Sequence, residues 1–153
     1  MWLVSRVITS HIGTNPVTQR AMLDGRIQVE LVPQGTLAER IRAGGFGLGG
    51  VLTKTGLGTE VEKGKMIINI NGEDYLLEKP LRANVALLYA EKADESGNLT
   101  YHGTTRNFNP YMGAAADLVI VEAKEIVKVG EISPDDVIVP GIFVDHIVYG
   151  GAE

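Results

Sequence analysis

Five of the seven residues from Gly44 to Gly50 are glycine, and no other feature limits the fold of this chain as strongly. Glycine has no Cβ atom, so it adopts positive φ and lets backbone amides approach a ligand closely. Leucine, valine and phenylalanine side chains alternate with these glycines, which argues against a flexible linker. We therefore predict an ordered loop whose amides face a substrate, with Gly44, Gly45 and Gly47 as its binding residues.

The composition is that of an ordinary soluble protein with one domain over residues 1–153. A net charge of −5 argues against nucleic acid as a partner, because phosphate binding needs a basic face. The absence of cysteine excludes a disulfide framework, a zinc–thiolate site and a thiol nucleophile. No apolar run approaches the length that crosses a bilayer. We expect a cytoplasmic protein with no membrane partner.

Two helices carry clear start and stop signals. Thr14 or Asn15 is suited to cap a helix over Pro16–Leu23, which Gly25 would end. Thr36 is suited to cap a second helix over Leu37–Ala43, with the paired glycines after it as the stop.

Short runs of β-branched and aliphatic residues predict the strands. The pair Asn71-Gly72 predicts a tight hairpin. Val85–Ala90 is apolar throughout, which suggests a strand buried on both faces. The predicted strands are Trp2–Ile8, Ile27–Val32, Met66–Ile70, Tyr75–Leu77, Val85–Ala90, Asp117–Glu122, Ile126–Val129, Val137–Val139 and Phe143–Val148, with a short helix from Asn109 to Ala116. This alternation predicts an α/β fold: an open, mostly parallel sheet flanked by helices, with β-hairpin elaborations.

Gln34 is the candidate catalytic residue. It follows the predicted strand Ile27–Val32, and ligands of open α/β sheets collect beyond the carboxyl ends of strands. A neutral side-chain amide there can donate to a developing oxyanion and position a substrate. The alternative is that Gln34 only closes the turn with Gly35.

Other site types lack support. The glycine cluster follows a helix pattern and no Gly-Lys-Ser/Thr closes it, so it matches neither a dinucleotide fingerprint nor a P-loop. The three histidines lack metal-ligand spacing, so no metal site is expected. No serine lies in a nucleophile elbow, and no glutamate near the loop has the apolar setting of a nucleophile. The acidic pairs Asp94-Glu95 and Asp135-Asp136 are expected to be solvated turn charges.

Six segments resemble the α subunit of bacterial 3-oxoacid or acetate coenzyme A-transferases, and together they span nearly the whole chain. They are ITSHIGTNP (8–16), VPQGTLAERIRAGGFG (32–47), TKTGLGTEVEKGK (53–65), EKPLRANVAL (78–87), RNFNPYMGAAADLVIVEA (106–123) and PDDVIVPGIFVDHIV (134–148).

The resemblance implies an α/β subunit that works in a hetero-oligomer with a β subunit. It implies transfer of coenzyme A (CoA) from an acyl-CoA, such as acetyl-CoA or acetoacetyl-CoA, to a free short-chain carboxylate. A β-subunit glutamate attacks the thioester, and a glutamyl-CoA thioester forms in a ping-pong sequence. The nucleophilic glutamate is therefore expected outside this chain. A CoA thioester is the expected substrate, with no tightly bound cofactor, and the resemblance places Gln34 at the active site.

The sequence departs from the family in two ways. The family's α subunits begin earlier, with strand–helix units and another glycine-rich turn, so we expect an N-terminally truncated sequence. Lys54 stands where the family often has proline, which frees φ and is expected to loosen the loop.

Two other functions remain open. One is a non-catalytic truncated remnant, or a structural or assembly module of the same fold. The other is a sugar-phosphate isomerase, which needs an acid and base pair that the sequence lacks. We also expect a partner chain to cover part of the apolar segment from Gly44 to Gly58, because its side chains are too apolar to stay exposed together.

Overall fold

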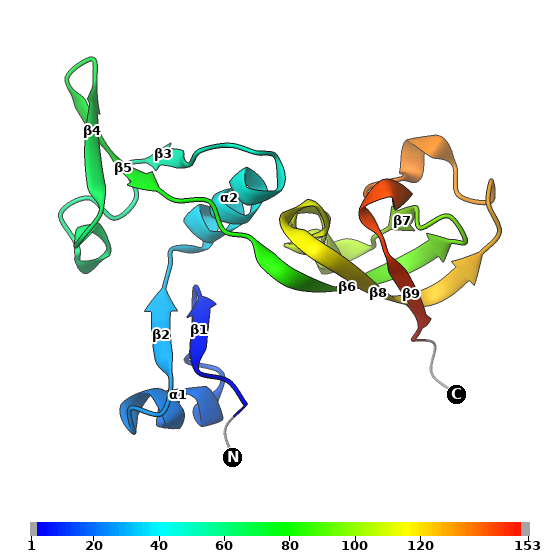
Figure 1. Ribbon diagram of the computed structural model, residues 1–153, viewed down its shortest axis with the longest axis horizontal. Coiled ribbons are helices and arrows are strands. Elements are labelled where there is room, and N and C mark those ends of the chain that lie inside the picture. Colours follow the sequence, from blue (N-terminus) through cyan, green and yellow to red (C-terminus); the bar gives the residue numbers. More distant parts are fainter. Residues whose placement is uncertain (1–2, 151–153) are drawn as a thin grey trace. The chain divides into compact units, whose positions relative to one another are not determined.

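The computed structural model describes residues 3–150, and these form two compact units. One unit holds residues 3–40 and 51–78, and the other holds residues 41–50 and 79–150 (Figure 1). Within residues 3–150, no helix is long and apolar enough to cross a membrane.

The first unit begins with a strand–helix–strand motif. The strands β1 (Arg6–Thr9) and β2 (Gln28–Leu31) pair in parallel, and α1 (Pro16–Leu23) connects them. The prediction of α1 is confirmed: the Asn15 side chain accepts a hydrogen bond from the N–H of Thr18 at 3.0 Å. The strand prediction that starts at Trp2 is only partly testable, because Trp2 lies outside the described residues.

A three-stranded antiparallel sheet completes this unit. Its strands follow the order β3-β5-β4, with β3 (Val51–Thr53), β4 (Met66–Ile70) and β5 (Glu73–Glu78), and a single 3-10 turn, η1 (Glu60–Glu62), lies between β3 and β4. Asn71 and Gly72 have φ values of 53° and 86°, as a two-residue hairpin turn requires. The predicted hairpin is therefore confirmed.

The helix α2 (Gln34–Gly45) begins earlier than predicted, so the expected range Leu37–Ala43 with a Thr36 cap is wrong. The N–H of Leu37 donates to the carbonyl of Pro33 at 2.9 Å, which closes the first helical turn three residues early. Proline holds φ near −65° and is therefore suited to begin a helix without a side-chain cap.

The end of α2 also differs from the prediction, because the helix includes Gly44 and Gly45 and ends at Gly45. Gly47, two residues later, has a φ of +70°. The N–H of Leu48 donates to the carbonyl of Ala43 at 3.0 Å, a bond that closes a helix around a left-handed glycine.

The second unit is built on a parallel sheet. Its strand order is β7-β6-β8-β9, with β6 (Ala83–Asp94), β7 (Leu99–Thr100), β8 (Ala116–Val127) and β9 (His146–Tyr149). The neighbours β6, β8 and β9 are parallel, and the short β7 pairs antiparallel with the end of β6. The connecting helical turns are η2 (Gly103–Arg106), α3 (Asn109–Met112), η3 (Gly113–Ala115), η4 (Pro134–Asp136) and η5 (Gly141–Phe143).

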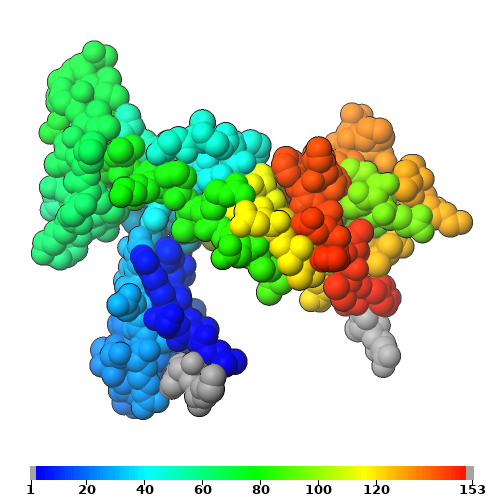
Figure 2. All heavy atoms as spheres, in the orientation of Figure 1, coloured from blue at the N-terminus to red at the C-terminus, as the bar shows by residue number. Residues whose placement is uncertain are grey.

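The core of this unit lies on one face of the sheet. The buried members are Ala86, Leu88, Ala90, Ala93, Leu99, Tyr101, Val119, Val121, Ala123 and Val139. Side chains from both crossover segments, 95–115 and 128–145, pack against this cluster, among them Met112 and Phe143. The green, yellow, orange and red segments of the unit pack together (Figure 2).

Three predictions for this unit need correction. The apolar run Val85–Ala90 is not buried on both faces, because both crossovers cover the same face and leave Leu87 70% exposed. The run Ile126–Val129 is not a separate strand, because its first two residues belong to β8. The run Val137–Val139 forms only an isolated β-bridge, between Val139 and Leu99.

Asp94 is a buried carboxylate and not a solvated turn charge. Its oxygens accept hydrogen bonds from the N–H groups of Ser96 and Asn98, both at 2.9 Å, and from the Asn98 side chain at 2.8 Å. Burial acts to raise the pKa of Asp94, but these hydrogen bonds outweigh it and hold the pKa below its ordinary value. The turn after β6 is therefore built around this carboxylate.

Candidate functional site

Gln34 is the first residue of α2, three residues beyond the end of β2, and its side chain is exposed. The backbone N–H groups of a helix's first turn have no acceptor within the helix and carry partial positive charge. The position beyond a strand's carboxyl end agrees with the expectation from sequence. The catalytic role of Gln34 stays a prediction.

A three-residue ion network holds α2 against the two parallel strands. Glu30 on β2 accepts a 2.8 Å hydrogen bond from Arg40 on α2 and a 2.6 Å bond from Arg6 on β1. The Arg40 hydrogen bond is the main reason that the pKa of Glu30 lies below its ordinary value, although partial burial opposes it. The network therefore positions the helix that carries Gln34.

Gly44 and Gly45 are explained by close packing within the second unit. A Cβ atom at Gly44 would lie 2.1 Å from the carbonyl oxygen of Leu81, and one at Gly45 would lie 2.9 Å from the Cβ of Ala114. A Cβ at Gly47 would meet nothing within 4 Å. Gly47 is therefore the member of the predicted binding trio with open space beside it, and its left-handed φ explains why glycine stands there.

The structure does not bring Gln34 close to the paired glycines. They lie at opposite ends of α2, and the rise of about 1.5 Å per residue separates their backbones by roughly 15 Å.

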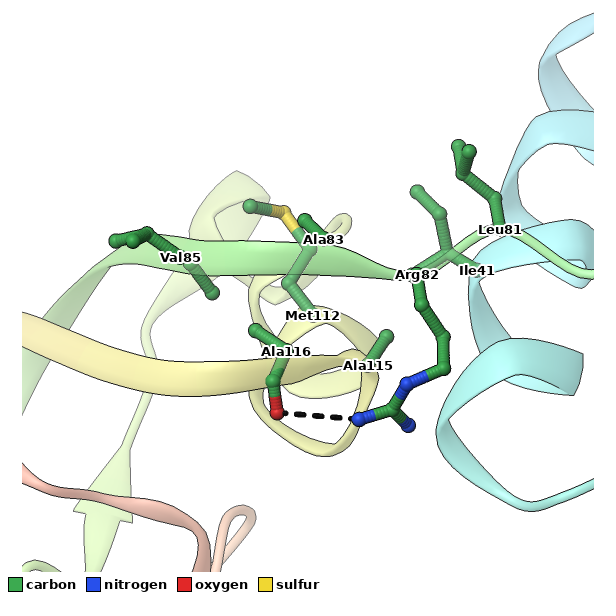
Figure 3. Close-up of a pocket in the computed structure, with 9 residues that line it drawn as sticks. Ile41, Leu81, Arg82, Ala83, Val85, Met112, Ala115 and Ala116 are labelled. Carbon is green, nitrogen blue, oxygen red and sulfur yellow. Dashed lines mark hydrogen bonds between the residues drawn. The ribbon is translucent and has the colours of Figure 1, made fainter.

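An apolar cavity of about 130 Å³ lies beside the C-terminal end of α2 (Figure 3). Its walls are mainly aliphatic and small: Ile41, Leu81, Arg82, Ala83, Val85, Ala86, Met112, Ala115 and Ala116. Its volume is close to that of engineered apolar cavities, about 150 Å³, that take up benzene. The cavity can therefore hold a short aliphatic group.

Arg82 is the single charged residue of this wall, and sequence reasoning missed it. Its guanidinium donates to the carbonyl of Ala116 at 3.4 Å (Figure 3). It also donates to the carbonyls of Gly44 at 2.9 Å and Ala114 at 3.3 Å, and it pairs with Asp117 at 3.2 Å. It thus ties the end of α2 to the start of β8. The sequence does show an arginine directly before an apolar strand, which could have marked Arg82 as a residue with a specific role. Its partners could not be predicted, because they are distant in sequence.

Lys54 contacts two side chains of β5. Its Nζ lies 2.8 Å from a carboxylate oxygen of Glu73 and 5.4 Å from the centre of the Tyr75 ring. The hydrogen bond from Lys54 lowers the pKa of Glu73, and the bond from the Tyr75 hydroxyl to Glu73 raises the pKa of Tyr75. Both contacts join Lys54 to β5, and the looser loop stays a prediction.

The remaining candidates have structural or surface settings. Among residues 3–150, no group of histidine and acidic side chains is arranged to hold a metal ion. Glu62, near the glycine segment, accepts a 2.6 Å hydrogen bond from the N–H of Gly58 and so closes its own turn.

The sequence model of the coenzyme A transferase family matches residues 3–150. This chain belongs to the coenzyme A transferase family. It is 54% identical over 145 residues to the acetate CoA-transferase subunit alpha of Escherichia coli (strain K12). It is 55% identical over 145 residues to the acetoacetyl-CoA:acetate/butyrate CoA transferase alpha subunit of Clostridium acetobutylicum. Each match covers 95% of this chain and 66% of the relative, so the chain spans about two thirds of their length.

Solved structures confirm the open α/β fold class. Glutaconate coenzyme A-transferase from Acidaminococcus fermentans matches with a TM-score of 0.85 at 20% identity, over 97% of this chain and 56% of that chain. An acyl-CoA transferase apoenzyme from Escherichia coli O157:H7 matches with a TM-score of 0.86 at 22% identity, over 96% of this chain and 32% of that chain. At these identities the likeness concerns the fold.

Proposed function

We propose that this chain acts as the α subunit of a CoA-transferase that moves CoA between a short-chain acyl-CoA and a free carboxylate. The observation that carries the proposal is the identity of 54% and 55% to two named CoA-transferase α subunits over nearly the whole chain. The names of these relatives specify acetate, acetoacetyl-CoA and butyrate, so we propose substrates of that size.

The proposed reaction uses a glutamate of a β subunit as nucleophile. Its carboxylate attacks the thioester carbonyl, the carbon–sulfur bond breaks, and CoA leaves as a thiolate while an acyl-glutamyl anhydride forms. The thiolate then attacks the glutamyl carbonyl, which releases the first carboxylate and leaves a glutamyl-CoA thioester. The acceptor carboxylate then attacks the glutamyl-CoA thioester and displaces the CoA thiolate, which forms a second anhydride. The thiolate attacks the acceptor's carbonyl in this anhydride, which releases the new acyl-CoA and regenerates the glutamate. This assignment agrees with the failure to find a nucleophile setting in the sequence of this chain.

Gln34 is proposed to position the substrate and to stabilise the oxyanion. Its exposed amide at the start of α2 can donate a hydrogen bond without adding charge. The Arg40–Glu30 ion pair supports this role, because it holds α2 at a set position against β2. A preorganised donor is effective only when the element that carries it is rigid.

Gly47 and the residues after it are proposed to face the CoA substrate, together with Gly44 and Gly45. Phe46 and Leu48, which flank Gly47, are exposed apolar side chains, and we propose that the β subunit or the substrate covers them. CoA enters as a thioester substrate, and we propose no tightly bound cofactor and a cytoplasmic location.

The test is co-expression with a candidate β subunit encoded nearby. We expect the two chains to co-purify and to transfer CoA from acetoacetyl-CoA to acetate. Mass spectrometry of the complex with acyl-CoA alone is expected to find CoA bound covalently to the β subunit. Turnover by this chain alone would contradict the proposed place of the nucleophile. A stable complex without turnover would favour the non-catalytic alternative.

A further inference from the structure

The C-terminal end of α2 is closed partly by a side chain from another element. The N–H of Leu48 donates to the carbonyl of Ala43 at 3.0 Å. The next carbonyl, that of Gly44, accepts a 2.9 Å hydrogen bond from Nη1 of Arg82, the residue directly before β6. The last four carbonyls of a helix have no donor within it and carry partial negative charge. The guanidinium therefore supplies a donor that the helix backbone lacks at this end.

The same guanidinium also holds the start of β8. Nη2 of Arg82 donates to the carbonyl of Ala116, the first residue of β8, at 3.4 Å (Figure 3). Nη1 donates in addition to the carbonyl of Ala114 in η3 at 3.3 Å. The N–H groups of arginine have a fixed, planar geometry, so these bonds form together only when the backbone segments keep their relative positions. Arg82 therefore links α2, η3 and β8 at a single point.

Asp117 fixes the orientation of this guanidinium. One carboxylate oxygen of Asp117 lies 3.2 Å from Nη2 of Arg82, and the other accepts a 3.3 Å hydrogen bond from the Asn84 side chain. The Arg82 and Asp117 side chains are 48% and 63% exposed, so the ion pair by itself contributes little stability. Its effect is to hold the guanidinium toward the three backbone carbonyls.

The paired glycines bring the end of α2 within reach of Arg82. A Cβ atom at Gly44 would lie 2.1 Å from the carbonyl oxygen of Leu81, and one at Gly45 would lie 2.9 Å from the Cβ of Ala114. Any larger residue at these positions would push the helix away from both neighbours. The close approach and the Arg82 hydrogen bonds therefore depend on each other.

Beyond Gly45 the chain has little packing of its own. A Cβ atom at Gly47 or Gly49 would meet nothing within 4 Å. The side chains of Phe46 and Leu48 are 55% and 42% exposed. The position of this stretch is therefore set by the end of the helix that precedes it. We call residues 44–50 the 44–50 segment.

We propose that Arg82 is the positioning residue of the 44–50 segment, and that it acts on substrate binding through the Gly44 carbonyl. The part that concerns CoA rests on the proposed function, in which this segment faces the CoA thioester. Loss of the Arg82 contacts frees the segment and weakens binding of the thioester equally in the ground state and the transition state. Uniform weakening of this kind raises KM and leaves kcat unchanged.

Hydrogen exchange of this chain alone tests the structural half of the proposal. In Arg82→Ala, the Leu48 amide is expected to exchange about tenfold faster than in the parent, because the end of α2 opens more often. The Leu37 amide, which is hydrogen-bonded at the other end of α2, is the internal control and is expected to change little. Arg106→Ala, at an exposed arginine on η2, is the matched variant and is expected to leave exchange at Leu48 unchanged.

Steady-state kinetics of the complete αβ assembly test the substrate-binding half. Arg82→Ala is expected to raise KM for acetoacetyl-CoA about tenfold and to keep kcat within about twofold of the parent. Arg106→Ala is expected to keep both constants. A general loss of folded enzyme would lower kcat without raising KM, so the split between the two constants identifies positioning. Arg82→Lys retains one donor group and is expected to show a smaller rise in both KM and the Leu48 exchange rate.

The two measurements separate failure of this proposal from failure of the proposed function. Unchanged exchange at Leu48 in Arg82→Ala would overturn the proposal. Faster exchange with an unchanged KM would also overturn it, because the segment would then move without effect on binding. A parent assembly without turnover would overturn the proposed function and the CoA half with it, while the exchange comparison would still decide whether Arg82 holds the segment. If Arg82→Ala does not fold, Arg82→Lys is judged by the same criteria.

Discussion

The guanidinium of Arg40 donates a 2.8 Å hydrogen bond to the carboxylate of Glu30, and this pair joins α2 to β2. The Arg40 side chain is only 11% exposed, so the bond is partly shielded from solvent. A hydrogen bond between charged groups in such a setting contributes about 1.5–3 kcal/mol. The pair therefore determines the position of Gln34 at the start of the same helix.

The first prediction concerns the pH dependence of this pair. The pKa of Glu30 is lowered from its ordinary value of 4.5 in the folded protein, so the folded state favours the ionised carboxylate. The stabilisation is present above pH 4.5 and is lost as the pH falls through the lower folded pKa. Glu30→Gln is expected to lower the urea midpoint at pH 7. Between about pH 5 and pH 3, the midpoint of this variant is expected to decrease less than that of the parent.

Glu60→Gln serves as the matched control, because Glu60 pairs with Lys63 on an exposed turn where such pairs contribute little. Its urea midpoint is expected to follow that of the parent across the pH range. Equal pH profiles for the parent and Glu30→Gln would show that the ion network does not stabilise the fold.

The second prediction tests Gln34 in a complete αβ assembly. Removal of one oxyanion donor costs about 10²–10³ in kcat, or roughly 3–4 kcal/mol. Gln34→Ala is expected to lower kcat on that scale and to leave folding and assembly unchanged, because the side chain is exposed. Gln34→Glu is expected to be at least as harmful, since a carboxylate repels both the oxyanion and the substrate.

Gln28→Ala, at another exposed glutamine on β2, is the control for Gln34→Ala and is expected to keep parental kcat. A kcat within about threefold of the parent for Gln34→Ala corresponds to under 1 kcal/mol. That result would assign Gln34 to turn formation alone.

The third prediction separates packing from ligand binding at the glycines. Gly44→Ala would place its Cβ 2.1 Å from the Leu81 carbonyl oxygen, so the backbone must shift. Overpacking of this kind costs about 1–3 kcal/mol, and a lower urea midpoint is the expected outcome. Gly49→Ala is the control, because its Cβ would meet nothing within 4 Å. If Gly44→Ala keeps full stability and weakens only CoA binding, the packing explanation is wrong.

The fourth prediction concerns Tyr101. Its hydroxyl is buried and has no hydrogen-bond partner among the described residues, and burial raises its pKa. An unsatisfied buried polar group costs about 1–3 kcal/mol, which phenylalanine would not incur. Tyr101→Phe is therefore expected to hold or raise the urea midpoint. If Tyr101→Phe lowers the free energy of unfolding by more than about 1 kcal/mol, the Tyr101 hydroxyl makes a hydrogen bond in solution.

The sequence by itself determined the local elements whose signals lie within a few residues. Asn15 and Pro16 define the start of α1, and Asn71-Gly72 defines the hairpin. The six family-like segments also led to the family that residues 3–150 match. These features depend on backbone conformation and neighbouring side chains, so they can be read without knowledge of distant contacts.

Only the tertiary structure decided which residues meet across the chain. Gly44 reads as a helix stop in the sequence, yet it lies inside α2, and a Cβ atom there would lie 2.1 Å from the carbonyl oxygen of Leu81. Leu87 reads as a core residue, yet it is exposed because both right-handed crossovers cover the opposite face of the sheet. Burial depends on what lies on each side of an element, and hydrophobicity along the chain does not specify that.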